Sequence, residues 1–202
     1  MKIHCFYHPL GNQDHLVIEL WRQSWQDHGW DPVILGIDEA QKHPRFEQFK
    51  SAVLKLPTIN GRDYETMCYL RWLAMAMQGP GWFTDYDVMN YGFKPYPPEK
   101  TTTCRSHIGG STIFGTQQLY DQAVDAILNY IPGPDDNING IPHCSDLYIL
   151  SKTLRPEIIL NIESIYSTPN YLAKPLIHYT NHFCNNRLKA IADDKKMLGL
   201  VH

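Results

Sequence analysis

The strongest constraint on the fold lies near the start of the chain, where two short apolar runs flank a segment with helical spacing. KIHCFY at 2–7 and DPVILGI at 31–37 have the length and composition of buried strands. The large apolar residues with helical spacing between them are Leu16, Val17, Leu20, Trp21 and Trp25. Two strands joined by a helix-length crossover run parallel, in a sheet covered on both faces. The sequence therefore predicts an α/β fold with a Rossmann-like, mostly parallel central sheet flanked by helices.

Composition and length predict one globular domain over residues 1–202, because 43% of the residues are hydrophobic. The net charge of −3, without a basic stripe, argues against nucleic acid as a partner. The chain has no signal-peptide-like start and no apolar run of membrane-spanning length. Its five cysteines are widely spaced and form no CxxC pair. We therefore expect a cytoplasmic protein with reduced thiols and no transmembrane segment.

A second helical pattern is followed by a short apolar run and two aspartates. Asp63 is expected to cap this helix. Its apolar stripe consists of Met67, Leu70, Ala74 and Met77. The run WFTDYDV at 82–88 then predicts a strand, in which Asp85 and Asp87 share one face. Two carboxylates this close repel each other unless a proton, a cation or solvent relieves the repulsion.

The two aspartates are expected at the carboxyl end of a strand, which is where ligands bind in open α/β sheets. Apolar Trp82 and Phe83 come first, and a proline-rich loop follows. Paired oxygen ligands suit Mg²⁺ or Mn²⁺, and such an ion keeps positions for substrate phosphate oxygens. A D-x-D tripeptide alone is also compatible with a plain strand end that faces solvent.

The run CYLRWLAMAMQGPGWFTDYDV at 68–88 resembles the donor-binding segment of GT-A-fold glycosyltransferases that carry a DXD motif. The likeness is greatest to capsular-polysaccharide and mannosyl-type transferases and to the glucosylating toxins. The matching residues are Arg71–Trp72, Gly79–Pro80–Gly81, Trp82–Phe83, Asp85–Tyr86–Asp87 and Val88. The resemblance implies a GT-A-like fold, with a donor half at about 1–92 and an acceptor half at about 93–202.

The activity that this resemblance implies is metal-dependent transfer of a sugar, with retention, from a UDP- or GDP-sugar to a glycan or other hydroxyl acceptor. It implies Mn²⁺ or Mg²⁺ as the cofactor, held by Asp85 and Asp87, with Arg71 and Asp85 in contact with the donor. One position departs from the family, which usually has an Asp three residues before the Arg, where this chain has Cys68. Either Glu65 or Asp63 takes its place, or the recognition of the sugar differs.

Two later segments add further candidates by resemblance. PLIHYTNHF at 175–183 resembles the late segment with which several GT-A enzymes close their metal site, which makes His178 the third ligand. His182, four residues on, leaves open a zinc site if the segment is helical, although its flanking residues favour strand and turn. CSDLYIL at 144–150 resembles an acceptor-side segment of retaining transferases and makes Asp146 the catalytic candidate. Asp146 is equally compatible with the start of a helix capped by Ser145.

The ends of the first two strands complete the predicted donor site. Phe6, Tyr7 and His8 lie where GT-A enzymes hold the nucleotide base and ribose. Asp38, after the second strand, is a candidate for a ribose hydroxyl, as an acidic residue is in dinucleotide-binding folds.

Three other functions compete with that of a glycosyltransferase. A nucleotidyltransferase usually has a glycine- and lysine-rich phosphate loop, which this sequence lacks. A glycosidase needs two carboxyl groups on opposite sides of the scissile bond, and aspartates two residues apart do not readily provide this. A catalytically inactive nucleotide-sugar-binding or scaffold protein of the same fold remains the alternative.

Overall fold

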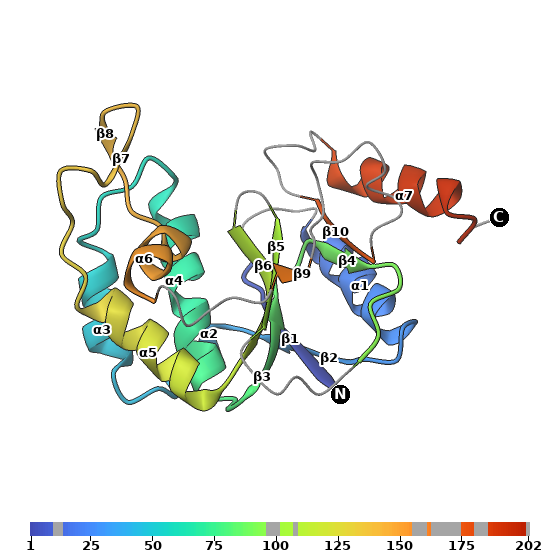
Figure 1. Cartoon of the computed structure of the whole chain (residues 1–202), viewed down its shortest axis with the longest axis horizontal. Coiled ribbons are helices and arrows are strands. Elements are labelled where there is room, and N and C mark those ends of the chain that lie inside the picture. Colours follow the sequence, from blue (N-terminus) through green and yellow to red (C-terminus); the bar gives the residue numbers. More distant parts are fainter. Residues whose placement is uncertain are drawn as a thin grey trace.

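The computed structural model of the chain has a mixed α/β fold built around one sheet, with strand order β2-β1-β3-β6-β5-β9 (Figure 1). Three of the five pairings between these strands are parallel, among them both pairings of β1. The predicted α/β class and mostly parallel sheet are therefore confirmed. The strands are β1 Lys2–Phe6, β2 Asp31–Leu35, β3 Gly81–Thr84, β5 Thr102–Ser106, β6 Gly109–Gly115 and β9 Asn161–Ile162. The structure describes residues 1–9, 14–95, 102–106, 109–154, 161–162, 175–179 and 186–200.

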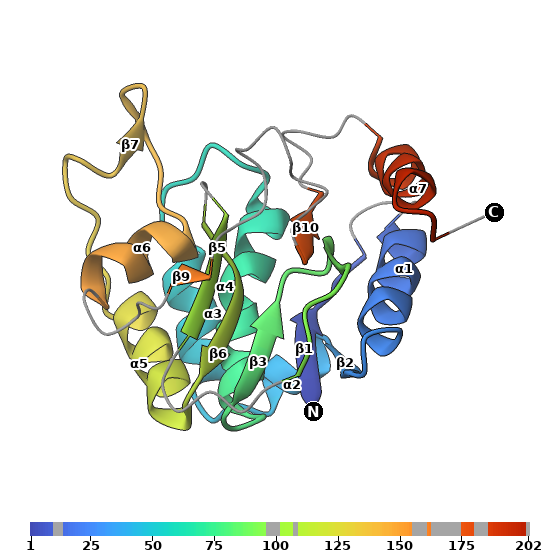
Figure 2. The same cartoon turned by 45° about the vertical axis from the view of Figure 1, so that its right-hand side comes forward.

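Helices cover both faces of the sheet (Figure 2). The side chains of its central strands alternate between two cores. Ile3 and Trp82 pack into the core with α1 and α7, whereas Phe6 and Phe83 pack into the core with α2 to α6. The helices are α1 Asp14–Gln26, α2 Ile37–Gln41, α3 Phe46–Val53, α4 Arg62–Ala76, α5 Gln117–Leu128, α6 Asp146–Thr153 and α7 Arg187–Met197. Burial on both faces is what parallel strands require. In the described parts of the chain, no helix has the length and apolarity needed to cross a membrane.

Helix α4 differs from its prediction in two ways. Its N-cap is Gly61, and the predicted cap Asp63 lies within the first turn, where its carboxylate faces the positive end of the helix. Met77, predicted on the apolar stripe, is exposed, whereas Trp72 is buried. The reason is that α4 packs against β1, α2, α3 and α5, and a helix covered from several sides has no single apolar stripe.

The prediction of one strand over residues 82–88 is wrong. Strand β3 ends at Thr84, and a turn closed by a hydrogen bond from Val88 N to Asp85 O separates it from β4, Val88–Asn90. Asp85 and Asp87 therefore lie in the turn, at the carboxyl end of β3 as expected. Strand β4 pairs antiparallel with β10, Leu176–His178, so that Val88 lies opposite His178.

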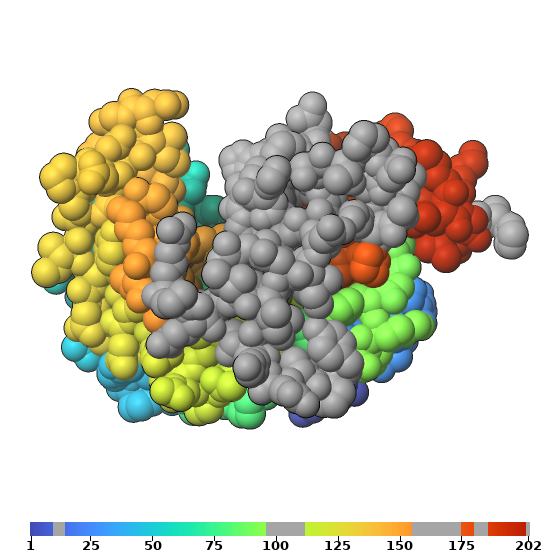
Figure 3. Space-filling view, in the orientation of Figure 1, coloured from blue at the N-terminus to red at the C-terminus, as the bar shows by residue number. Residues whose placement is uncertain are grey.

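The second half of the chain holds elements that were not predicted. A hairpin of β7, Asn137–Ile138, and β8, Ile141–Pro142, lies between α5 and α6. Its turn has positive φ at Asn139 and Gly140, which suits these two residue types. The hairpin segment and α7 lie at opposite ends of the molecule (Figure 3). His182 and its zinc alternative lie outside the described residues.

Candidate metal centre

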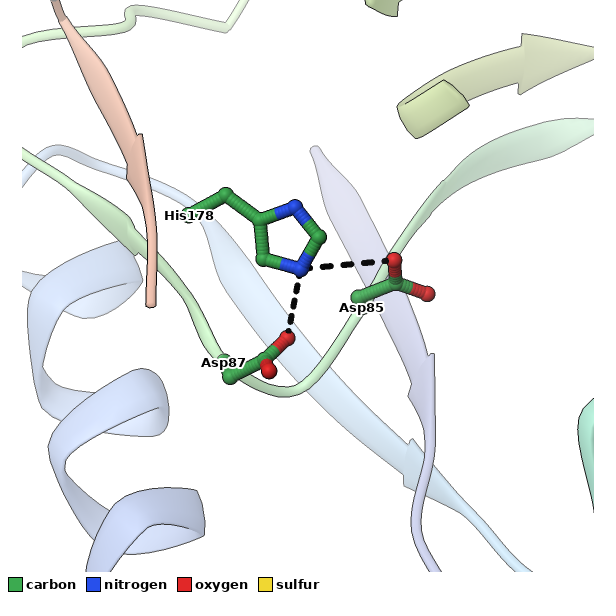
Figure 4. Close-up of side chains that lie close together, drawn as sticks. All are labelled: Asp85, Asp87 and His178. Carbon is green, nitrogen blue, oxygen red and sulfur yellow. Dashed lines mark ion pairs between the residues drawn. The ribbon is translucent and has the colours of Figure 1, made fainter. Parts of the chain in front are cut away.

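Three side chains from two distant segments converge above the carboxyl end of β3 (Figure 4). Nε2 of His178 lies 3.0 Å from Oδ1 of Asp87 and 3.7 Å from Oδ2 of Asp85. One donor atom from each residue lies within 4.8 Å of the other two. The antiparallel pairing of β4 with β10 produces this convergence, because it places His178 beside the turn that carries both aspartates.

The separations of His178 Nε2 from the two carboxylates suit a single divalent ion. Ligands held about 2.1 Å from an octahedral ion lie about 3.0 Å apart when adjacent and about 4.2 Å apart when opposite. The two distances from His178 Nε2 fall within this range. Two carboxylates with one imidazole form a donor set for Mn²⁺, which accepts nitrogen more readily than Mg²⁺ does. The residues present therefore fit the predicted ion.

Each aspartate directs its other oxygen to an arginine. Arg71 Nη1 donates to Oδ1 of Asp85 at 2.6 Å, and Arg187 Nη1 lies 3.7 Å from Oδ2 of Asp87. Each carboxylate thus has a guanidinium behind it while one oxygen faces the shared centre, and such outer contacts orient carboxylates that ligate a metal.

Asp146 is connected to the site by a hydrogen bond from Arg71. Its Oδ2 accepts hydrogen bonds from Arg71 Nε at 2.8 Å and from Trp72 Nε1 at 2.7 Å, and its Oδ1 accepts from Leu147 N at 2.8 Å. The residue is 3% exposed. With both oxygens engaged, Asp146 fixes the guanidinium of Arg71, and its catalytic role stays a prediction.

Burial and ion pairing set opposite pKa directions for the two aspartates. Burial raises the pKa of Asp85 by more than Arg71 and His178 lower it. Burial also acts to raise the pKa of Asp87, but the ion pair and hydrogen bond with His178 outweigh it, so the net pKa is lowered. Burial acts to lower the pKa of His178, and the attraction of Asp87 outweighs it, so the net pKa is raised. Without a bound metal, Asp87 and His178 thus form an ion pair.

The second imidazole nitrogen of His178 has, among the described residues, no hydrogen-bond acceptor of the kind that a metal-ligating histidine usually has. Nδ1 is buried, and no group in the described part of the chain hydrogen-bonds it. A proton placed on Nδ1 would leave the lone pair of Nε2 directed at the two carboxylates. That lone pair is the one a metal ion between them would use.

The predicted base-binding residues are only partly brought together. Phe6 is buried in the core that α2 to α6 form with the sheet, and Asp38 is exposed in the first turn of α2. Tyr7 is half-buried, and its ring meets the ring of Tyr86 edge-on at 5.4 Å, next to the aspartate turn. His8 is half-buried beyond the end of β1. Tyr7 is therefore the member of this group that the structure places in contact with the site.

Cys68 stands where the glycosyltransferases that the chain resembles usually have an Asp, and its thiol lies beside Arg71. Cys68 lies one turn before Arg71 on α4, and burial raises its pKa, so the thiol is neutral. Glu65, a proposed substitute, is 2% exposed and accepts a hydrogen bond from Asn60 Nδ2 at 2.7 Å. Burial raises the pKa of Glu65. Asp63, the other proposed substitute, is exposed.

Arg187 is the site residue that sequence reasoning missed. It is the first residue of α7, about a hundred residues from the aspartates, and no local motif marks it. The only available signal was the helical spacing of Arg187, Ile191 and Asp194, of which the last two are buried.

Residues 2–95 match a domain of unknown function, DUF8765. The matched segment includes Arg71, Asp85 and Asp87, and it ends before Asp146 and His178. No curated protein matches the chain.

Proposed function

We propose that this protein is a metal-dependent glycosyltransferase that moves a sugar, with retention, from a UDP- or GDP-sugar to a glycan or other hydroxyl acceptor. The observation that carries the proposal is the convergence of Asp85, Asp87 and His178, with an arginine behind each carboxylate. The GT-A-like interpretation of the fold belongs to the same proposal. It is supported by the parallel order β2-β1-β3 and by the paired aspartates at the carboxyl end of β3.

Asp85, Asp87 and His178 are the residues that would hold Mn²⁺ or Mg²⁺. A bound divalent cation supplies Lewis acidity, which neutralises the charge that develops on a departing diphosphate. His178 binds in its neutral form, because Nε2 needs a free lone pair to ligate. The two carboxylates bind as anions, and their second oxygens stay with Arg71 and Arg187.

The charges of the site favour an anionic substrate once a divalent cation is bound. Three carboxylates, on Asp85, Asp87 and Asp146, face the two guanidiniums of Arg71 and Arg187. With neutral His178, this set has one negative charge in excess. A divalent cation turns the excess into one positive charge, and Arg71 and Arg187 then add to the potential that attracts a diphosphate.

The proposal is tested by a thermal-shift screen of UDP, GDP and CDP and their sugars, each with and without Mn²⁺. At a hundredfold excess over Kd, a ligand that binds only the folded state adds about 2.7 kcal/mol of stability. We expect a shift that requires both Mn²⁺ and the carboxylate of Asp87, and that is lost in Asp87→Asn. Asp135→Asn is the matched control, because Asp135 is exposed in a loop near the hairpin.

Either result is decisive for the donor site. A metal-dependent shift that Asp135→Asn keeps and Asp87→Asn loses supports the proposal and identifies the base. A folded wild-type protein that no nucleotide stabilises, with or without Mn²⁺, contradicts it.

A catalytically inactive nucleotide-sugar-binding protein is the second candidate. Two observations favour it: Cys68 stands where the resembling enzymes have an Asp, and both oxygens of Asp146 are engaged by other groups of the protein. The two candidates differ in turnover. An enzyme releases free sugar from its donor slowly even without an acceptor, whereas a binding protein returns the donor intact, which chromatography of the reaction mixture distinguishes.

A further inference from the structure

A cavity of about 260 Å³ lies at the N-terminal ends of β1 and β3, at the edge of the sheet away from the aspartate turn (Figure 2). About 150 Å³ is enough to hold a benzene-sized molecule, so this cavity has room for one substituted ring. Polar and apolar residues both contribute to its lining, among them Lys2, His4, Gln78, Pro80, Trp82 and Phe114. A few polar groups among apolar ones are typical of small-molecule sites.

His4 is a buried polar side chain of this cavity with one nitrogen left for a ligand. It is 5% exposed, and its Nδ1 lies 2.9 Å from the carbonyl oxygen of Trp82. A carbonyl oxygen only accepts, so Nδ1 carries the proton and Nε2 keeps a lone pair. No group in the described part of the chain hydrogen-bonds Nε2. A buried acceptor without a partner is costly, which indicates that a molecule in the cavity donates to it.

The direction of this lone pair is set by the neighbouring strand. Gly81 lines the same cavity, and a Cβ at its position would lie 3.3 Å from Cε1 of His4. Because glycine has no Cβ, the imidazole ring lies against the backbone of β3. Together with the hydrogen bond to Trp82, this contact fixes the ring before any ligand arrives, and a preorganised acceptor costs less entropy to engage.

The charges of the cavity favour a ligand with both a hydrogen-bond donor and a negative charge. Burial lowers the pKa of His4, with a smaller contribution from Lys2 in the same direction. These effects outweigh the carbonyl of Trp82 and the charge of Asp31, which act to raise the pKa. His4 is therefore neutral at neutral pH and accepts at Nε2. Lys2, whose side chain is exposed, adds a positive charge to the lining.

We propose that this cavity binds a single-ring aromatic acid that carries a hydroxyl or N–H donor. The donor bonds Nε2 of His4, the acid group pairs with Lys2, and the ring packs against Trp82 and Phe114. The rings of these last two residues already contact each other edge to face, with centres 5.6 Å apart, so an aromatic ring extends an existing cluster.

The proposed site is separate from the metal centre. The four residues of β3, Gly81–Thr84, lie between the cavity and Asp85, which is about 13 Å at about 3.3 Å per residue. A one-ring molecule does not span this distance. The inference therefore does not depend on the proposed function, and binding in the cavity needs neither metal nor nucleotide.

The test titrates the wild-type protein with three matched probes, followed by NMR. We expect 4-hydroxybenzoate to bind with a Kd of about 1 mM or below, as suits a one-ring ligand. The probe 4-fluorobenzoate lacks the donor and should bind about three- to tenfold more weakly, the scale of one hydrogen bond. The probe 4-hydroxybenzamide lacks the charge and should bind about two- to fivefold more weakly, the scale of an exposed ion pair. A long-range ¹H–¹⁵N spectrum of the imidazoles gives the location, because 4-hydroxybenzoate should shift Nε2 of His4.

Two variants test the same contacts from the protein side. His4→Phe keeps a ring and removes the acceptor, so it should weaken 4-hydroxybenzoate about three- to tenfold and leave 4-fluorobenzoate unchanged. Lys2→Met should weaken both acids about two- to fivefold and leave 4-hydroxybenzamide unchanged. Lys196→Met, at an exposed position on α7, is the matched control and should change none of the affinities. Because the probe series uses the wild type, the inference stays testable even if His4→Phe does not fold.

Three outcomes would overturn the inference. Equal affinities for 4-hydroxybenzoate and 4-fluorobenzoate would show that Nε2 of His4 accepts nothing from the ligand. No shift of that nitrogen with any probe at several millimolar would leave solvent as the content of the cavity. Binding that requires Mn²⁺ would place the probe at the metal centre. Failure of the proposed function would leave all of the expected results in place, since these titrations contain no metal and no nucleotide.

Discussion

The two arginines behind the aspartates are held in different ways. Arg71, on α4, donates to Asp85 at 2.6 Å and to Asp146 at 2.8 Å, and both partners are protein carboxylates. Arg187, on α7, donates to the hydroxyl of Tyr86 and approaches Asp87 only to 3.7 Å. Arg71 is thus fully neutralised within the protein, whereas the closest hydrogen-bond acceptor described for Arg187 is uncharged.

This difference predicts unequal contributions of the two arginines to stability. A guanidinium between two buried carboxylates stabilises the fold, because its removal would take the nearest cation away from both of them. Removal of Arg187 would leave Asp87 paired with His178, so Arg187 is expected to contribute less to the stability of the fold.

The largest effect is expected from Arg71→Met, which should lower the free energy of unfolding by about 3 to 5 kcal/mol, as for loss of one partner of a buried ion pair. Asp85 and Asp146 would lose their shared cation. Urea unfolding followed by circular dichroism measures the effect. Arg187→Met should cost less than half as much, because Asp87 keeps His178 as a partner. Equal costs for the two variants would remove the distinction between the two arginines.

A buried carboxylate outside the site provides the benchmark for a purely structural role. Asp136 accepts hydrogen bonds from Tyr130 OH, Gly133 N and Lys152 Nζ, at the base of the hairpin. We expect Asp136→Asn to cost about 1 to 3 kcal/mol at neutral pH, the range for hydrogen bonds to a charged group. It should leave the affinities for Mn²⁺ and nucleotide unchanged, which distinguishes it from changes at the metal centre.

The stability difference between wild type and Asp136→Asn should decrease at low pH. Burial acts to raise the pKa of Asp136, but the hydrogen bonds from Lys152 and the neighbouring donors outweigh it, so the net pKa is lowered. The stabilisation is therefore complete above the unfolded value of about 3.9 and is lost as the pH falls through the lower folded value. The stability difference between wild type and Asp136→Asn should shrink below about pH 4. A difference that stays constant down to pH 3 would contradict this.

The sequence predicted the half of the site that is local in the chain. The strand–helix–strand unit, the carboxyl-end position of Asp85 and Asp87, and the helix that starts after Ser145 depend on short-range periodicity and capping, which sequence patterns carry. The sequence predicted strand where the structure has a turn between Thr84 and Val88. A short apolar run does not show at which residue the hydrogen-bonded pairing of a strand ends.

The other half of the site depends on pairings between distant segments. His178 reaches the aspartates only through the pairing of β10 with β4, which no local pattern encodes, and its position came from resemblance alone. Arg187 depends on the docking of α7, whose inward face is mixed, with a cation and a carboxylate around one isoleucine. A helix of this kind has little amphipathic signal, because its buried polar groups are satisfied by tertiary partners that the sequence does not reveal.

Tyr179→Phe weakens the tie that holds α7 beside the centre. The change removes the hydroxyl that donates to Asp194 at 2.6 Å, in a buried position, and should cost about 1 to 2 kcal/mol of stability. Urea unfolding measures the effect. An unchanged free energy of unfolding would show that this hydrogen bond does not hold α7 in place.

The smallest effect is expected from Tyr86→Phe. The ring stays, so its contact with Tyr7 and the apolar packing are kept, and only the hydroxyl that accepts from Arg187 at 2.9 Å is lost. The free energy of unfolding should therefore fall by about 0.5 to 1 kcal/mol, the lower part of the range for one hydrogen bond. In an Arg187→Met background the same change should cost less, since the hydrogen bond is already absent. Additive losses in the double variant would mean that the hydroxyl of Tyr86 stabilises the fold through another partner, and that Arg187 is held by other contacts.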